Sequence, residues 1–311
     1  MNQQDATSPR ESVGSLRVAL VGDLHTYRLA VGPWRLLGKR LVGQANVWFS
    51  RRRRFDRKLL PGLFERVAAI EPDVLLLSGD LTSTALPREF ADMAAMLAPL
   101  TRTIRTFIVP GNHDRYTYSS SWRKAFRRRL GAVLAHRWPH ADKLSERWHV
   151  LALDTAVPRL LDSRGKVTQR QLEGARQAVG AVQPGEGLIV LSHYPVVMPP
   201  QNQPHWRHRL GGAADLLAAL GGCRGRVIYA HGHIHEPWLF HPEGQSTLTD
   251  INAGAPCQVN DRYPLGQGFW EIALPASPAS PAAFRHHCLA ELSPDRWEVC
   301  EHADPGLPSG S

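Results

Sequence analysis

The amino-acid sequence predicts an α/β fold in which two β-sheets form a layered sandwich with helices outside. Up to Gly232, short apolar segments alternate with segments of helical periodicity, a pattern typical of α/β proteins. Beyond Gly232, apolar segments follow one another without clear helices between them. A layered sandwich with outer helices accommodates both halves of this pattern.

Six early strands are expected, because each is a short apolar run that ends at a turn-forming or polar residue. They span residues 17–21, 74–77, 106–109, 149–153, 188–191 and 226–230. The segments between them repeat apolar residues at intervals of three and four, which is the period of an amphipathic helix. These helices are expected at residues 59–70, 89–97, 120–130, 169–179 and 213–220. Later strands are expected at residues 238–241, 246–252, 269–274 and 285–290.

Length and composition favour one elaborated domain. A chain of 311 residues, 43% hydrophobic and 21% charged, can bury a full-sized core. We expect residues 1–15 to form a disordered tail and residues 16–311 to form the domain. The start of the chain lacks the basic and apolar segments of a secretory signal, and no run approaches the roughly 20 apolar residues of a membrane span. These features predict a cytoplasmic protein.

The cysteine content and the net charge exclude few classes of function or partner. The four cysteines are widely spaced, which is typical of free thiols in a reducing compartment. The formal net charge of +9 attracts anions in general. Nucleic acid, an anionic membrane surface and a phosphorylated small molecule all remain open as partners.

The ends of five early strands carry the residue types that bind divalent metals. Oxygen and imidazole donors from Asp, Asn and His suit hard or borderline ions. The donors occur in Gly22-Asp23-Leu24-His25, Gly79-Asp80-Leu81-Thr82, Gly111-Asn112-His113-Asp114, Ser192-His193 and His231-Gly232-His233-Ile234-His235. In an open α/β sheet, such turns converge on one edge.

Spacing within these motifs also favours a shared site. Residues two apart on an extended segment point the same way, so Asp23 with His25, and His233 with His235, can each supply two ligands. A single Gly-Asp or Asn-His-Asp is typical of an ordinary turn or capped loop. The conjunction of five such strand ends indicates a metal site rather than unrelated turns.

This ordered set, running from about Val18 to His235, resembles the signature of the calcineurin-like metallophosphoesterase superfamily. The resemblance implies a two-layer β-sandwich flanked by helices, with two divalent ions of manganese, iron or zinc at one sheet edge. The implied ligands are Asp23, His25 and His235 for one ion, Asn112, His193 and His233 for the other, and Asp80 as a bridge between both.

The resemblance further implies a metal-dependent phosphoric ester hydrolase, in which a hydroxide that bridges the ions attacks a phosphodiester or pyrophosphate bond. In the family, the position of His113 supplies a proton to the leaving oxygen, and that of Asp114 orients and charges the ring. The alternative for His113 is a structural loop histidine. His231 matches no ligand position and is expected to be either a strand residue or a residue that contacts the ligands. Thr82 and Ser83 stand where many relatives have a further acidic residue.

Two segments bear on the substrate. The insertion at residues 27–58 is basic and apolar, and its Trp and Arg residues at 34–54 suit either an anionic membrane surface or a solvated helix packed on the core. The loop at residues 199–209 follows His193 and is interpreted either as a source of phosphate or base contacts or as an ordinary surface loop.

Several functions remain open at this stage. Relatives with basic insertions suggest a lipid A precursor (UDP-diacylglucosamine) pyrophosphatase at the inner membrane surface, with a lipid-linked substrate, and a cyclic-nucleotide phosphodiesterase has a similar core. A nuclease is favoured by the net charge of +9, but no aromatic and basic strand-binding module is evident. A catalytically inactive metal-binding scaffold is the alternative of another class.

Overall fold

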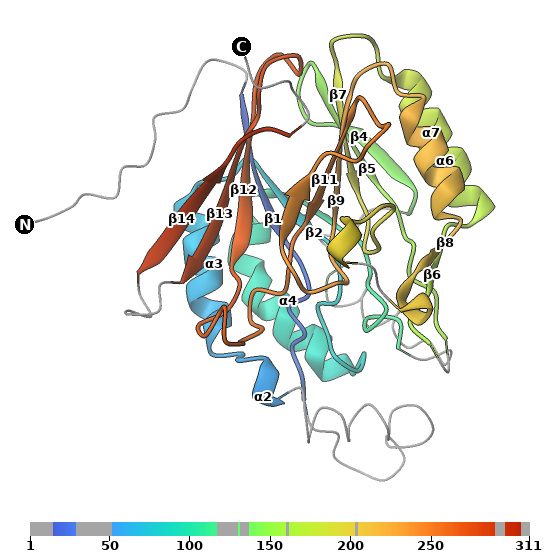
Figure 1. Cartoon of the computed structure of the whole chain (residues 1–311). Helices are drawn as coiled ribbons and strands as arrows, with labels where there is room; N and C mark the ends of the chain where they lie inside the picture. The colour runs from blue at the N-terminus through green and yellow to red at the C-terminus, as the bar shows by residue number, and fades with distance from the viewer. Residues whose placement is uncertain are drawn as a thin grey trace, which may run out of the picture.

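The computed structural model describes residues 15–28, 52–116, 130, 137–159, 162–202, 205–289 and 296–305. The helix expected at residues 120–130 lies almost wholly outside the described residues, as do the tail up to residue 14 and most of the insertion at residues 27–58. The tail, the insertion and the single-domain organisation therefore stay predictions. Within the described ranges, two six-stranded sheets stand face to face (Figure 1).

The first sheet is built around strand β1 and has the order β14-β13-β12-β1-β2-β3. Its strands are β1 (Leu16–Val21), β2 (Val74–Leu77), β3 (Arg105–Ile108), β12 (Phe269–Leu274), β13 (Ala283–Leu289) and β14 (Trp297–His302). Strand β1 pairs in parallel with β2 and antiparallel with β12, where Leu16 lies opposite Leu274. The late strands thus complete the sheet that the early strands begin.

The second sheet has the order β10-β11-β9-β7-β5-β4, with its four inner strands parallel. Its strands are β4 (His140–Lys143), β5 (Trp148–Ala152), β7 (Gly187–Leu191), β9 (Arg226–His231), β10 (Trp238–Phe240) and β11 (Leu248–Asn252). Two short strands, β6 (Gly165–Lys166) and β8 (Leu210–Gly211), pair with each other beside it.

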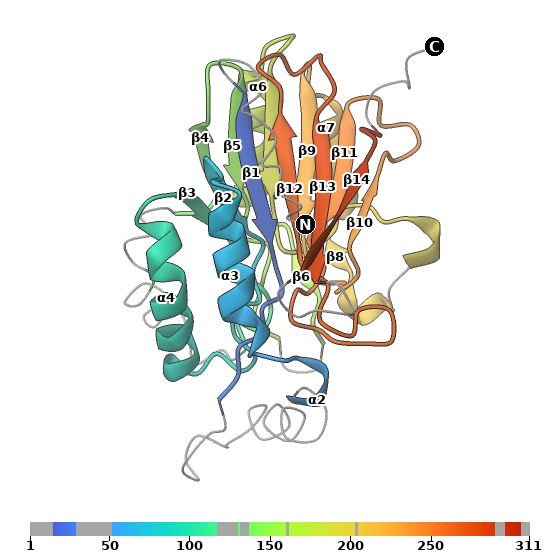
Figure 2. The ribbon, with the colours of Figure 1, turned by 90° about the vertical axis from the view of Figure 1, so that its left-hand side faces the viewer.

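Helices cover both outer faces of the sandwich. Helices α3 (Leu59–Ala69) and α4 (Pro87–Thr101) lie on the first sheet, and α6 (Gln169–Ala181) and α7 (Ala213–Gly221) on the second (Figure 2). Shorter elements are α2 (Arg52–Arg54) and the 3-10 turns η3 (Pro200–Asn202) and η4 (Trp206–His208). This arrangement confirms the predicted two-layer β-sandwich flanked by helices. None of the described helices is long and apolar enough to cross a membrane.

Alternation along each strand builds the layers. Val18 and Leu20 of β1 point into the core between the sheets, where they pack with Ile189 and Ile228. Ala19 and its neighbours on the opposite face pack against α3 and α4. Because both faces of the central strands are buried, these strands read as continuous apolar runs, which is what made them predictable.

Candidate active site

The turns after β1, β2 and β9 hold their polar residues in left-handed backbone conformations. The φ angles are 48° at Asp23, 46° at His25, 51° at Asp80, 76° at His233 and 56° at His235. The extended conformation expected for the Asp-x-His and His-x-His pairs is therefore not adopted. Non-glycine residues enter this region at a cost of order 1 kcal/mol or more each, and they persist there only where the surroundings fix them.

Backbone pairing between the first two turns provides such fixation. The amide of Asp23 donates to the carbonyl of Gly79 (3.0 Å), and that of His25 donates to the carbonyl of Asp80 (2.9 Å). The pairing of β1 with β2 is thereby carried past the ends of both strands. As a result, Asp23, His25 and Asp80 project toward one another.

Four of the predicted ligands form one tight cluster. Donor atoms of Asp23, His25, Asp80 and His235 all lie within 4.8 Å of one another. The Nε2 atoms of His25 and His235 are 2.9 Å apart, and Nε2 of His235 is 3.2 Å from Oδ1 of Asp23. Nε2 of His25 is 3.7 Å from Oδ2 of Asp80. Two imidazole nitrogens and two carboxylates thus face a common centre.

Asp80 links this cluster to a second group of predicted ligands. Its Oδ2 lies 3.6 Å from Nε2 of His193, which in turn lies 3.1 Å from Oδ1 of Asn112. The other ring nitrogen of His193, Nδ1, donates to the carbonyl of Ser78 (2.9 Å). This bond fixes the ring so that Nε2 points at Asp80 and Asn112.

His233 lies at the edge of the second group. Its ring stands 5.1 Å from that of His193 and 4.3 Å from that of Tyr194. Its Nε2 donates to the carbonyl of His208 (3.1 Å). Nδ1 is therefore the nitrogen with the lone pair that can bind a metal ion. The structure therefore brings all seven predicted ligands to one edge of the sandwich, four of them in direct proximity.

Burial keeps the histidines of the second group neutral. Desolvation lowers the pKa of His193 to about 4, and it also lowers the pKa of His233 well below its ordinary value. A neutral imidazole has the lone pair that a metal ion needs, so these rings are in the ligating form at physiological pH.

The residues present fit a divalent metal centre. Oδ1 of Asp23 is buried and accepts no hydrogen bond, although it faces His235. A second buried carboxylate, that of Asp80, shares the site. Buried carboxylates are costly unless positive charge compensates them, and a mixed set of carboxylate and imidazole donors suits manganese, iron or zinc. A Cβ at Gly232 would lie 2.2 Å from Oδ2 of Asp23, so glycine is required for the backbone to approach this carboxylate.

His113 and Asp114 lie in the turn beside the cluster. The ring of His113 stands 5.0 Å from that of His25, and its amide donates to Oδ1 of Asp80 (2.7 Å). Nδ1 of His113 donates to the carbonyl of Ser83 (2.8 Å), which therefore orients the ring, a role that the family resemblance gave to Asp114.

The Asp114 carboxylate instead organises the backbone of the turns. It accepts hydrogen bonds from the amides of Gly111, Leu81 and Thr82 and from the Thr82 hydroxyl. Its complete burial raises its pKa to about 6 despite these donors. Asp114 thus ties the second and third turns together and acts on His113 through the loop.

Several contacts at the site have no signal in the sequence. Gln258 accepts from Nδ1 of His235 (2.9 Å), and the hydroxyl of Ser83 donates to the carbonyl of His25 (2.8 Å). The carbonyl of Ser78 holds His193 as described above. These partners lie in turns and loops without a local pattern, so only the fold could identify them. His231 is a buried strand residue, as expected, and its Nε2 lies 2.9 Å from Oδ1 of Asp250.

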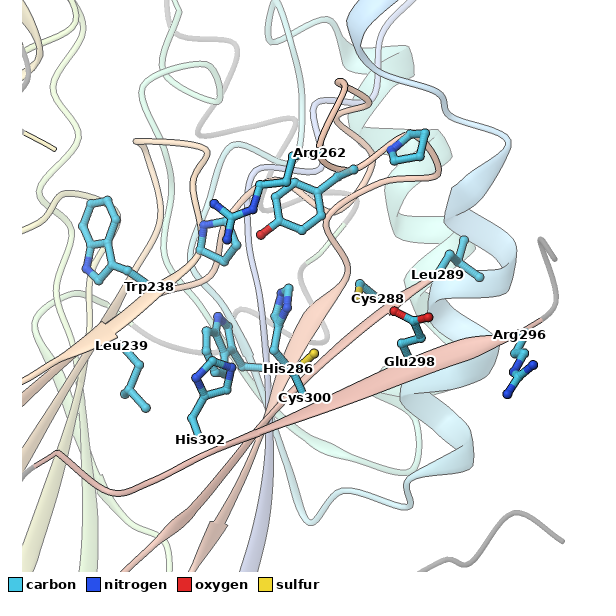
Figure 3. A pocket seen from close by; sticks show the side chains of 14 residues that line it. Trp238, Leu239, Arg262, His286, Cys288, Leu289, Arg296, Glu298, Cys300 and His302 are labelled. Carbon is cyan, nitrogen blue, oxygen red and sulfur yellow. The ribbon is translucent and has the colours of Figure 1, made fainter. Parts of the chain in front are cut away.

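A cavity of about 750 Å³ lies elsewhere, between the edge of the second sheet and the β13–β14 hairpin (Figure 3). Trp238, Arg262, His286 and His302 are among the residues that line it. None of the predicted ligands lines it. The candidate active site is therefore the cluster at the strand ends.

Comparison with known proteins supports the same assignment. The family model described as calcineurin-like phosphoesterase matches residues 16–237. A probable cyclic nucleotide phosphodiesterase from Rhodococcus erythropolis (strain PR4 / NBRC 100887) is 28% identical over 182 residues, which is 58% of this chain and 56% of that protein. The chain thus matches little more than half the length of this relative.

Solved structures share the fold. A dimetal phosphatase from Danio rerio superimposes with a TM-score of 0.61 at 13% identity, over 93% of this chain and 99% of that one. The purple acid phosphatase PPD1 from yellow lupin (Lupinus luteus) gives a TM-score of 0.55 at 13% identity, over 90% of this chain and 52% of that one. The family match covers most of the chain, and members of this family bind a dinuclear metal centre. The chain therefore belongs to the calcineurin-like phosphoesterase family.

Proposed function

We propose that this protein hydrolyses a phosphodiester or pyrophosphate bond with two divalent ions held at the strand-end cluster. Asp23, His25 and His235 would hold one ion, and Asn112, His193 and His233 the other. The observation that carries the proposal is the position of Asp80, whose Oδ2 lies 3.7 Å from His25 and 3.6 Å from His193. A carboxylate between two donor groups is placed to bridge two ions.

Two bound ions would supply an activated water and neutralise charge on the phosphoryl oxygens. The chain's own residues hold the geometry for that chemistry. The amide of His113 fixes Oδ1 of Asp80, and the amide of His233 donates to Oδ2 of Asp23 (2.8 Å). Each carboxylate therefore has one oxygen held by the backbone and one oxygen turned to the donor cluster.

His113 is the group proposed to protonate the leaving oxygen. Because its Nδ1 donates to the carbonyl of Ser83, the proton given to the leaving oxygen would come from Nε2 of the doubly protonated ring. Asp114 holds the turn that presents this ring. Loss of His113 should therefore affect turnover more than it affects metal content.

The direct test is turnover of bis(para-nitrophenyl) phosphate by protein reconstituted with manganese, with the para-nitrophenyl monoester as the comparison substrate. Asp80→Ala should lower kcat/KM by at least about 10³-fold, because it weakens both metal positions. His113→Ala should lower kcat by about 10²- to 10⁴-fold, the range that general acid catalysis supplies.

Metal content measured on the same samples separates the two roles. His113→Ala should retain its manganese, whereas Asp80→Ala should lose it. A folded, metal-loaded wild-type protein that cleaves neither these esters nor a pyrophosphate diester with any divalent ion would contradict the proposal and favour the scaffold function. Faster monoester than diester cleavage would exclude the phosphodiester assignment.

A further inference from the structure

A cationic platform adjoins the candidate active site. We propose that Arg164, Trp206 and Arg207 form a subsite for a second phosphate group, so that the enzyme prefers substrates in which two phosphates are linked. The inference rests on the proposed hydrolysis at the strand-end cluster. It narrows the substrate class to pyrophosphate diesters.

The platform is joined to the active site through His208. The carbonyl of His208 accepts from Nε2 of His233 (3.1 Å), and the two rings stand 5.9 Å apart. Trp206 and Arg207 immediately precede His208 in turn η4. A substrate whose reacting phosphate lies at the cluster would therefore extend toward this turn at the His233 side.

Backbone contacts fix the platform to the core. Turn η4 is pinned to the segment before β6, because the amide of Ser163 donates to the carbonyl of Arg207 (3.1 Å). The hydroxyl of Tyr194 donates to the carbonyl of Ser163 (2.5 Å). Tyr194 is buried and its ring packs on His233, so the same side chain supports both the platform and the active site.

Two guanidinium groups are held on one indole ring. The Arg164 guanidinium lies 5.1 Å from the centre of the Trp206 ring, and that of Arg207 lies 5.3 Å from it. Stacking engages the face of a guanidinium and leaves the N–H groups at its edge free to bind a phosphate in bidentate fashion. The indole therefore works as a spacer that keeps two cations together against their mutual repulsion.

Part of the hydrogen-bonding capacity of the two guanidinium groups is available to a ligand. Arg164 contacts Oδ2 of Asp162 through both Nε (3.1 Å) and Nη2 (3.0 Å), so this edge of its guanidinium is occupied and Nη1 remains for a ligand. Among the described residues, no hydrogen bond or ion pair involves the Arg207 guanidinium, so its N–H groups are free for a ligand. Trp206 is 50% exposed, which places the platform at the open rim of the site. Two cations and one carboxylate leave a positive excess that suits a phosphate.

The reaction that follows is the addition of water across a P–O–P linkage. One phosphorus gains the water oxygen, the bond from that phosphorus to the bridging oxygen breaks, and the bridging oxygen stays with the other phosphate. Two phosphomonoesters and protons result, and no electrons are transferred. The platform would bind the departing phosphate, whose negative charge increases as the bond breaks.

Two matched substrates test the proposal. Bis(para-nitrophenyl) phosphate carries one phosphate, and P1,P2-bis(para-nitrophenyl) pyrophosphate carries two with the same aryl groups. Cleavage of the two-phosphate substrate is monitored by chromatographic detection of its product, the para-nitrophenyl monoester. The wild-type protein should show a KM at least about tenfold lower for the two-phosphate substrate, since charge-assisted hydrogen bonds are the strong ones. Arg207→Gln should remove most of this difference while it leaves the KM of the one-phosphate substrate within about twofold.

Arg209→Gln is the matched control. It also removes one positive charge, only two residues from Arg207, but the Arg209 side chain is not one of the two that stack on Trp206. It should leave the KM ratio of the two substrates unchanged. Trp206→Leu keeps both arginines but removes their spacer, and it should lower the ratio as Arg207→Gln does. Its thermal unfolding shows whether the fold as a whole survives the change.

The outcomes separate this inference from the proposed function. An equal KM for both substrates in the wild-type protein, or equal effects of Arg207→Gln and Arg209→Gln, would overturn the second-phosphate subsite and leave diester hydrolysis intact. Absence of turnover for both substrates would instead contradict the proposed function itself.

Discussion

At the scale of single residues, the site is built from residues whose backbone conformation is energetically unfavourable. Asp23, His25, Asp80, His233 and His235 all hold left-handed φ angles that their side chains disfavour. The residue types and their order could be predicted, because each follows a buried apolar strand. The backbone conformation could not, because it results from pairing between turns that are far apart in the sequence.

Ser83 illustrates the same limit. No local pattern around Ser83 indicates a role at the site. In the structure its carbonyl accepts from the ring of His113, and its hydroxyl donates to the carbonyl of His25. Both are contacts between turns, which no local spacing encodes.

His286 gives a prediction at this scale. Burial lowers its pKa to about 3, and its Nε2 has no hydrogen-bond partner. The folded pKa lies below the unfolded value of about 6.5, so the unfolded chain binds more protons between these values. The associated stability is present above pH 6.5 and is lost as the pH falls toward 3.

His286→Leu should therefore flatten the decline in unfolding free energy between pH 6.5 and pH 4, by up to about 1.4 kcal/mol per pH unit. Urea titrations at several pH values measure this slope. Every other titrating group is common to both proteins. Equal pH dependence of the unfolding free energy in the two proteins would show that His286 takes up its proton as readily in the folded state as in the unfolded state.

At the scale of elements, the strands that could be predicted from the sequence were those buried on both faces. Central strands such as β2 and β7 are apolar throughout and were predicted to within a residue. Strands β4 (His140–Lys143) and β14 (Trp297–His302) lie at sheet edges, carry charged residues and were missed. Edge strands are commonly charged, since this discourages pairing with other chains. Their sequence therefore resembles that of a loop.

Helix α4 shows a second source of error. The apolar period predicted residues 89–97, but the helix begins at Pro87 and continues through Pro99 to Thr101. Its start is fixed by the buried carboxylate of Glu89, which accepts from the amides of Thr84, Leu86 and Arg28 and from the Thr84 hydroxyl. This carboxylate anchors the segment that follows Ser83.

Glu89→Ala should destabilise the fold by roughly 3 kcal/mol or more, because it leaves several buried donors unsatisfied. Chemical denaturation measures the loss. Glu65→Ala, on the exposed face of α3, is the matched control and should change stability by less than about 0.5 kcal/mol. A comparable loss in both variants would argue against a specific anchoring role for Glu89.

At the scale of the whole molecule, the active site joins the two sheets. Asp23, Asp80 and Asn112 follow strands of the first sheet, whereas His193 and His235 follow strands of the second. Each proposed ion would take ligands from both sheets. Metal binding should therefore stabilise the sandwich as a unit, in proportion to the ion concentration relative to its Kd.

Removal of metal by a chelator should lower the Tm of the wild-type protein by several degrees, and excess manganese should restore it. Asp80→Asn preserves size and tolerates a left-handed φ, so the metal-free variant should be at least as stable as the metal-free wild type. Its Tm should not respond to manganese. Calorimetry with and without the ion measures both effects, and an equal response in the two proteins would exclude Asp80 as a ligand.

The antiparallel pairing of β1 with β12 also sets an order of events during synthesis. Strand β1 emerges from the ribosome before its partner β12, which ends only at Leu274. The carboxylates of Asp23 and Asp80 are made early, and the last histidine of the set, His235, follows more than 150 residues later. A nascent chain that has not yet been extended past His235 therefore lacks part of the ligand set, and the complete set can select a metal only after strand β9 and the turn that follows it have been made.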